Sequence, residues 1–316
     1  MKKLALLLAF LFIAIFGVLI GMSCDNITSG SISYKGERIG LIHVEGVITA
    51  SKEDELSTLT FTGGSSSEKI VQQLDEARKD SNIKAVVMRI NSPGGSAAGS
   101  QEIYNAIKQY RSSGKKLIVS IGDVAASGGY YIASPADIIY ANPSSLTGSI
   151  GVIIQLLNYE GLFDKIGLDE ITLKAGKFKD IGNPNRPMTD EERKILEALL
   201  ADVHALFKES VMEGRGMTKE QVDVLATGEI WTGRQAKDKK LVDEIGGLKD
   251  ALDRAAKEAG LDPEDYVVSP IGEGSIFDQI LKGFNMGERS GVISDPLQAL
   301  GRILFLNPVA ARMVIK

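Results

Sequence analysis

The chain contains few of the side chains that usually carry metal or redox chemistry. Its 316 residues include one cysteine, Cys24, and two histidines, His43 and His204. A single cysteine excludes a disulfide within one chain, and no His/Cys cluster has the spacing of metal ligands. The net charge of −5 argues against a nucleic-acid partner, since such proteins carry basic surfaces. We therefore expect no metal, no cofactor and no nucleic acid.

The N-terminus carries an uncharged, mostly apolar run, Leu4–Met22, directly after Lys2 and Lys3. The run approaches the roughly 20 residues that a helix needs to span a bilayer, and it exceeds the ~7–15 apolar residues of a cleaved signal. It therefore predicts a retained, single-pass transmembrane helix. The two lysines favour a cytoplasmic start, which places the chain after Asp25 outside the cytoplasm. A cleaved signal peptide and a lipoprotein modified at Cys24 are the alternatives.

Strand and helix signals alternate along much of the chain. Residues 38–49, 83–90 and 116–121 are rich in β-branched and apolar side chains and predict strands. Helices are expected at 97–111 and at 189–213, the second opened by a capping box. This alternation predicts an α/β fold with a largely parallel sheet. Such sheets place their sites at the carboxyl ends of strands, where this sequence has glycines and small residues.

The sequence also predicts several shorter secondary-structure elements and four segments with separate roles. The shorter elements are strands at 138–141, 150–156 and 262–270, an extended stretch at 170–173, helix starts at 65, 124 and 218, and a helix at 158–166. The divisions are an anchor at 1–24, a linker at 25–37, an α/β domain at 38–262 and a C-terminal tail at 263–316. The apolar stretch 297–314 of the tail is expected to form an amphipathic helix that docks on the core or on a neighbouring subunit, and contact with the membrane is the alternative.

Ser127 lies in a turn of small residues, Ala125–Tyr131, where a strand passes into a helix. Small neighbours would let a substrate carbonyl approach its hydroxyl, and the Gly128 N–H lies where an oxyanion donor is needed. The pattern is typical of a nucleophile, but also of an ordinary serine that caps a helix. A second turn, Asn91–Gly95, contains Gly94 and could supply another N–H group. A plain Pro-Gly turn is the alternative reading there.

A serine nucleophile needs a base, and neither histidine is a good candidate. His43 lies on an expected strand, and His204 lies on an amphipathic helix, where both fit ordinary structural roles. The remaining option is a lysine kept neutral by burial or by neighbouring positive charge. Lys177 and Lys179 share one face of an extended stretch, so periodicity does not choose between them, and a solvated basic run is the alternative.

Several short segments together resemble one known family. They are NSPGG (91–95), AASGGYY (125–131), TGSIGV (147–152), GKFKDIGNP (176–184), WTGRQA (231–236) and LVDEIGG (241–247). Their order and spacing, over about Gly40 to Gly247, are similar to the short form of the signal peptide peptidase A family of serine peptidases. Lys240 departs from the glycine that many members have before Leu-Val-Asp.

The resemblance implies a role for each matching residue. Ser127 would be the nucleophile, Lys179 the general base and Ser149 the partner that orients the lysine. Gly94 and Gly128 would supply the oxyanion N–H groups. The family implies a crotonase-like (Clp-protease-like) α/β fold with an N-terminal transmembrane helix, and no cofactor.

The implied function is that of a membrane-anchored serine endopeptidase with its catalytic domain outside the cytoplasm. Its substrates would be remnant signal peptides, cut near small and apolar residues by a Ser-Lys dyad. Subunits of a homo-oligomer would share each active site, one giving the serine and its neighbour the lysine. A crotonase-like acyl-CoA enzyme and a non-catalytic membrane scaffold of the same fold are the alternatives. Coenzyme A is cytoplasmic, which argues against the first.

Overall fold

The computed structural model describes residues 36–51 and 64–272. The expected anchor at 4–22, nearly all of the linker and the apolar stretch 297–314 lie outside these residues. Within the described part, no helix combines the length and the apolar character that a membrane span requires.

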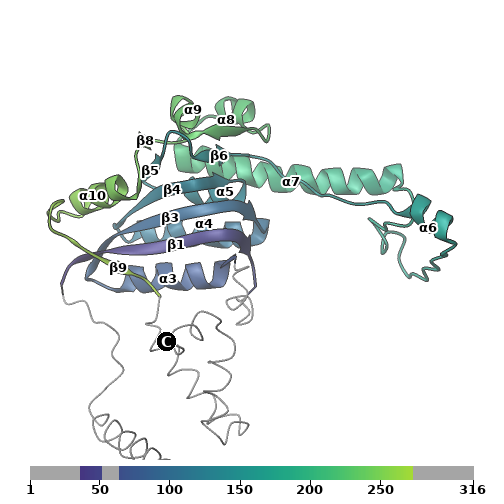
Figure 1. The fold of residues 1–316 in the computed structure, drawn as a ribbon, viewed down its shortest axis with the longest axis horizontal. Coiled ribbons are helices and arrows are strands. Elements are labelled where there is room, and N and C mark those ends of the chain that lie inside the picture. The colour runs from purple at the N-terminus through teal and green to yellow at the C-terminus, as the bar shows by residue number, and fades with distance from the viewer. Residues whose placement is uncertain (1–35, 52–63, 273–316) are drawn as a thin grey trace, which may run out of the picture. The chain divides into compact units, whose positions relative to one another are not determined.

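The described residues are built around one sheet, whose longest strands are parallel neighbours (Figure 1). Its main order is β2-β1-β3-β4-β5-β8, and all of these pairs are parallel. The bounds are β1 Arg38–Thr49, β2 Ser65–Ser66, β3 Ile83–Gly95, β4 Lys116–Ala126, β5 Ile138–Ala141, β6 Leu146–Gly148, β7 Ile230–Thr232, β8 Glu244–Ile245 and β9 Val267–Pro270. β6 pairs parallel with the carboxyl end of β4 and antiparallel with β7, so this part of the sheet differs from the parallel remainder.

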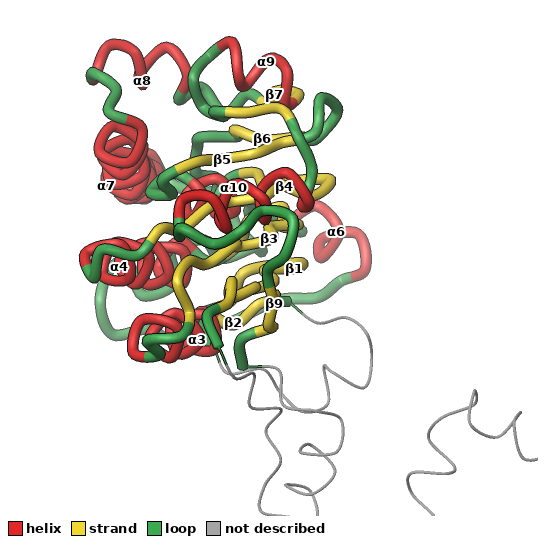
Figure 2. Tube along the Cα trace, turned by 90° about the vertical axis from the view of Figure 1, so that its left-hand side faces the viewer, coloured by secondary structure: helices red, strands yellow, loops and turns green. Residues whose placement is uncertain are grey.

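Helices cover both faces of the sheet. α3 (Ser67–Lys79), α4 (Ala97–Ser112) and α5 (Gly128–Ala133) enclose the larger core with β1, β3 and β4, and Figure 2 shows α3 and α4 on one side of the strands. α10 (Leu248–Glu258) packs on the other face over Ile39, Val87 and Ile118. This arrangement explains the near-continuous apolar run of β3, because a strand covered on both faces no longer alternates between apolar and polar side chains.

A long helix leads away from the sheet. α7 (Asp190–Arg215) begins beyond it, beside α6 (Glu160–Ile166), and its C-terminal half packs near α5 (Figure 1). We call residues 151–191 the arm. None of its side chains is buried, and the first buried one after it is Glu192. α8 (Lys219–Leu225) and α9 (Gly233–Asp238) then return the chain to β7 and β8.

The outer edge of β1 is covered by two short strands. β9 pairs with Arg38–Leu41 at one end, and β2 pairs with Ile48–Thr49 at the other. Between them, the Ser65 hydroxyl donates to the Glu45 carbonyl (3.0 Å) and accepts from the Glu45 N–H (2.8 Å). β9 belongs to the sheet although it follows residue 262, where we expected the domain to end.

The mixed α/β architecture and its principal strands are confirmed, whereas several local predictions are wrong. Ser65 does not cap a helix, because its hydroxyl is held by Glu45 and α3 begins only at Ser67. The chain from Val124 to Ala126 continues β4, so the following helix starts at Gly128. Residues 150–156 and 170–173 form no strand, since they lie on or next to the arm, where no neighbouring strand pairs with them.

Candidate active site

Ser127 occupies a strained turn between β4 and α5. Its φ is +53°, a left-handed conformation that a residue with a Cβ adopts rarely and often at functional sites. Its N–H donates to the Gly148 carbonyl (2.9 Å), and its carbonyl accepts from the N–H groups of Tyr130 and Tyr131 (both 2.9 Å). These bonds fix the turn through the backbone and leave the side chain out of them.

The Ser127 hydroxyl is unoccupied. It does not cap α5, and it makes no hydrogen bond with residues 36–51 or 64–272. The side chain is partly exposed, whereas the residues on both sides of it are buried. Ser127 thus occupies the N-cap position of α5 without using its hydroxyl as a cap, and the hydroxyl is available for chemistry.

Ser149 stands next to the same turn. Like Ser127 it has a left-handed backbone, with φ of +51°, and it follows Gly148, which accepts the Ser127 N–H. The Ser149 N–H donates to the Glu229 carbonyl (2.7 Å), so the antiparallel approach of β7 holds it there. The structure thus brings together the two serines that we singled out.

The two glycine turns also meet at this place. A Cβ added to Gly94 would lie 2.7 Å from the Gly128 nitrogen and 2.9 Å from Ser127 Cβ, so only glycine fits there. The Gly128 N–H, at the first position of α5, has no hydrogen-bond acceptor among the described residues. It is therefore free to donate to a developing oxyanion.

Gly94 is less free than Gly128. Its N–H donates to Ser92 Oγ (3.1 Å), and that hydroxyl donates in turn to the Gly46 carbonyl (2.6 Å). The Ser96 N–H donates to the Ile48 carbonyl of β1 (2.8 Å), and since successive N–H groups of an extended chain point to opposite sides, the Gly95 N–H before it faces away from β1. A Cβ added to Gly128 would lie 3.2 Å from the Gly95 nitrogen. Gly95 is thus a second candidate for the donor that we predicted at Gly94.

A small pocket opens beside Ser127. Its volume is about 70 Å³, and it is lined by Gly95, Ala97, Ser100, Ser127, Gly128, Tyr131, Gly151, Val152, Val203 and Phe207. The rings of Tyr131 and Phe207 lie 4.8 Å apart, which closes one wall. A pocket of this size and lining accommodates a small apolar side chain.

Tyr131 is fixed at this wall by three elements. Its hydroxyl donates to Gln101 Oε1 of α4 (2.5 Å) and accepts from the Ser210 hydroxyl of α7 (2.8 Å). Burial raises the pKa of the Tyr131 phenol, which keeps it neutral. Val203, Phe207 and Ser210 all come from α7, and their distance from Ser127 in the sequence hid their role.

The three lysines of the basic stretch differ in their partners. Lys174 pairs with Asp180, and Lys177 pairs with Glu191. Lys179 is exposed and makes no side-chain contact with a carboxylate in the described part of the chain. Lys179 is thus the lysine of this stretch that can present an amine to another molecule, a distinction that periodicity did not make.

The structure does not bring Lys179 to Ser127 within one chain. Its segment is tied to the N-terminal end of α7, where Lys177 contacts Glu191, whereas Ser127 faces Val203 and Phe207. With a rise of about 1.5 Å per residue, Glu191 and Val203 lie roughly 18 Å apart along the helix. No lysine side chain spans such a gap, so a base at Lys179 needs a second chain.

Neither histidine is an alternative base. His43 lies on β1 with its Nδ1 3.8 Å from a Glu45 carboxylate oxygen, and His204 has a buried Nε2 without a partner in the described residues. Neither of them lines the pocket beside Ser127. No group of His, Cys, Asp or Glu with the geometry of a metal site occurs in 36–51 or 64–272.

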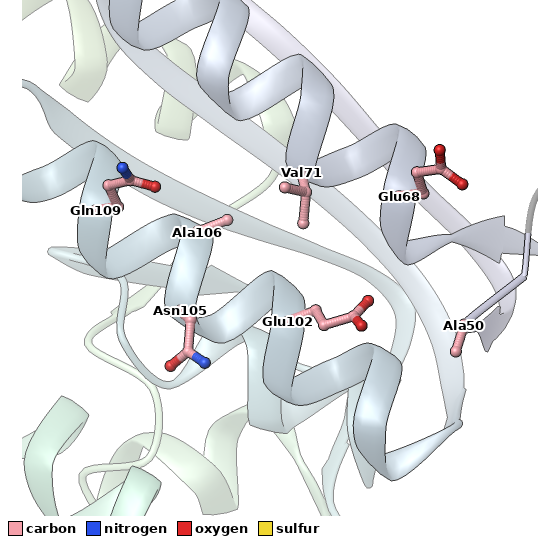
Figure 3. Close-up of a pocket in the computed structure, with 7 residues that line it drawn as sticks. All are labelled: Ala50, Glu68, Val71, Glu102, Asn105, Ala106 and Gln109. Atoms are coloured by element: carbon pink, nitrogen blue, oxygen red, sulfur yellow. The ribbon is translucent and has the colours of Figure 1, made fainter.

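A larger groove lies elsewhere, between α3 and α4 (Figure 3). It has a volume of about 550 Å³ and is lined by Ala50, Glu68, Val71, Glu102, Asn105, Ala106 and Gln109. The Glu102 carboxylate accepts from Ser67 Oγ (2.5 Å). The groove contains neither a nucleophile nor one of the predicted residues, so size alone does not identify the site.

Comparison with known proteins places the site in a matched region. The sequence model of Peptidase family S49 matches residues 109–262, and that of Clp protease matches residues 52–145, in agreement with the expected Clp-protease-like fold. The Synechocystis sp. protein slr0021, which carries a provisional protease name, is 39% identical over 223 residues, covering 70% of this chain and 80% of that protein.

Two further relatives carry more specific names. An Enterococcus faecium protein, provisionally named signal peptide peptidase SppA, is 36% identical over 225 residues, covering 71% of this chain and 64% of that protein. The chloroplastic serine protease SPPA of Arabidopsis thaliana is 35% identical over 195 residues, covering 61% of this chain and 29% of that protein. Ser127, Ser149 and Lys179 all lie inside the 109–262 match.

Proposed function

Because this chain belongs to peptidase family S49 and is a serine peptidase, we propose that it is a membrane-anchored endopeptidase that degrades remnant signal peptides. Ser127 is its nucleophile and Lys179 its general base. The observation that carries the proposal is the unoccupied Ser127 hydroxyl, held in a left-handed turn beside the free Gly128 N–H.

The proposed reaction proceeds through an acyl-enzyme. The Lys179 amine, acting as the general base, removes the proton from Ser127 Oγ, which attacks the peptide carbonyl carbon, and the carbonyl oxygen becomes an oxyanion. Gly128 donates to this oxyanion together with Gly94 or its neighbour Gly95. One such donor is worth roughly 3–4 kcal/mol in the transition state.

Collapse of this intermediate breaks the peptide bond, and the protonated lysine gives its proton to the leaving amine. Lys179 then takes a proton from a water molecule, whose oxygen attacks the ester carbon. The acid product leaves and Ser127 Oγ regains its proton from the lysine. Ser149, next to the Ser127 turn, is the proposed hydrogen-bond partner that orients the lysine amine.

Each active site is proposed to use two subunits. The gap of roughly 18 Å along α7 keeps Lys179 from the serine of its own chain. The arm that carries it also exposes large apolar side chains, among them Ile153, Leu157, Leu162, Ile171 and Leu173, the last two 85% and 94% exposed. Large exposed apolar side chains concentrated in one segment favour association, here with a second copy of the chain.

The membrane setting follows from residues outside the described part. The apolar run Leu4–Met22 is proposed to anchor the chain in the cell membrane, with the catalytic domain on the extracytoplasmic side. A small apolar pocket beside Ser127 fits substrates that themselves come from the bilayer.

The test compares three alanine variants on one apolar peptide. Ser127→Ala and Lys179→Ala should lose activity by at least about 1,000-fold, whereas Lys177→Ala, the matched control, should retain it. A fluorophosphonate probe should label the natural protein at Ser127. Unimpaired hydrolysis by Ser127→Ala, or no labelling in any assembly state, would refute the proposal and favour a scaffold.

A further inference from the structure

The segment that carries Lys179 is tied to α7 by a network centred on Arg186. Arg186 Nε donates to Asp180 Oδ2 (3.2 Å), and Nη2 donates to the Asp180 carbonyl oxygen (3.2 Å). On its other side the guanidinium donates to both Glu192 oxygens, from Nη1 (2.9 Å) and from Nη2 (2.5 Å). Arg186 thus joins the residue next to Lys179 to the first turn of α7.

Glu192 anchors this network in the helix. It is the third residue of α7 and forms a capping box with Thr189, accepting from the Thr189 N–H (2.9 Å). Its side chain is 3% exposed, and that of Asp180 is 11% exposed. Its bond to Arg186 is the main reason that the pKa of Glu192 falls to about 2, so Glu192 is charged at neutral pH.

The network is the more buried of two ties between this segment and α7. The other is the Lys177–Glu191 pair, whose side chains are 69% and 56% exposed and which therefore contributes little, and Lys174 pairs with Asp180 within the arm. No side chain in residues 151–191 is buried, so no apolar core fixes where Lys179 lies. The turns around it are held by backbone bonds from Lys179 N to Gly176 O (3.2 Å), from Ile181 N to Phe178 O (3.1 Å) and from Asn183 N to Asp180 O (3.0 Å). The forked guanidinium adds bonds to both the backbone and the side chain of Asp180, a geometry that an ammonium group cannot reproduce.

We propose that Arg186 is a positioning residue for the base: through Asp180 and Glu192 it fixes the segment that presents Lys179 to the serine of a neighbouring subunit. The inference rests on the proposed role of Lys179. A base that is held before the subunits meet loses less conformational freedom when the site forms. A base displaced by about 1 Å lowers a rate by up to about 100-fold, so this network should matter for turnover.

The test uses the full-length protein in its assembled form. Arg186→Met should lower kcat by about 10- to 100-fold and leave KM and the oligomeric state unchanged. Arg186→Lys, which keeps the charge without the fork, should recover part of kcat. Glu192→Gln removes the anchor from the other side and should lower kcat in the same way.

The matched control is Arg193→Met. Arg193 is exposed on the same turn of α7, and its side chain pairs with no described residue, so its loss should leave kcat unchanged. Amide hydrogen exchange offers a readout besides activity. Residues 179–183 should exchange faster in Arg186→Met and Glu192→Gln, and at the natural rate in Arg193→Met.

The outcomes separate this inference from the proposed function. If Lys179→Ala is inactive while Arg186→Met and Glu192→Gln keep full kcat, the positioning role is overturned and the base remains. Loss of the assembly, or a change confined to KM, would equally overturn it, because it would show a structural role. If Lys179→Ala is active, the proposed base fails and this inference fails with it.

Discussion

Two inactive variants should restore activity to each other if neighbouring subunits share each site. In Ser127→Ala the lysine is intact, and in Lys179→Ala the serine is intact. Because Lys179 lies on the arm and Ser127 beside Val203, the two residues of one chain do not form a dyad. An assembly that contains both variants can place the intact serine of one subunit beside the intact lysine of the other.

The number of sites that combine an intact serine with an intact lysine determines how much activity the mixture recovers. In a heterologous ring each interface makes one site, from the serine of one subunit and the lysine of the next. In an equal, random mixture about one quarter of interfaces join an intact serine to an intact lysine. We therefore expect about a quarter of the natural activity, whereas a dyad within one chain predicts none.

The assay measures hydrolysis of an apolar fluorogenic peptide after the variants are dissociated, mixed and reassembled in detergent. Each variant treated alone gives the baseline, and the natural protein taken through the same cycle gives the maximum. Mixed assemblies are verified by native mass spectrometry. Verified mixed assemblies with no activity above baseline, or a fully active monomer, would show that the sites are not shared.

Three further predictions concern the site and its support. Gly94→Ala should abolish hydrolysis, because the new Cβ would lie 2.7 Å from the Gly128 nitrogen; circular dichroism checks that the fold persists, and an active variant would contradict the packing. Phe207→Ala should favour peptides with a larger residue at the cut and lower the free energy of unfolding by about 3–5 kcal/mol, measured in urea; an unchanged preference would contradict the pocket wall. Arg186 holds the pKa of Glu192 at about 2, below the ~4.3 of a glutamate in an unfolded chain. The charged carboxylate therefore stabilises the fold fully above about pH 4. This stabilisation is lost as the pH falls through about 2. Glu192→Gln should therefore reduce the acid-induced loss of stability, and an identical pH dependence would contradict the ion pair.

The sequence predicted the elements whose signals are local. The strands from Arg38 and from Lys116 follow from apolar and β-branched runs, and the long helix follows from its period and its cap at Thr189. The cap expected at Ser65 failed because its hydroxyl bonds to β1, a contact between segments that are apart in sequence. A local sequence pattern carries no information about a hydrogen-bond partner that lies far away in the sequence.

The candidate site was predictable only in part, for a similar reason. Ser127 and Gly128 lie in a recognisable turn, but the wall of the pocket comes from Val203 and Phe207, which look like ordinary members of an apolar helix stripe. The choice of Lys179 needed either the family resemblance or the carboxylate partners of the other lysines. Arg186 gave no signal, because its partners are set by how the arm folds against α7.

Because β9 covers the outer edge of β1, it determines how far the protein can be truncated from its C-terminus. β9 occupies the hydrogen-bonding groups of Arg38–Leu41, so a protein ending before Val267 would leave this end of the edge open to strands of other molecules. Ending after Gly272 keeps β9 in place, with the Ile271 N–H still bonded to the Leu41 carbonyl (3.0 Å). The protein that ends before Val267 should therefore aggregate, whereas the protein that ends after Gly272, only a few residues longer, should remain in solution.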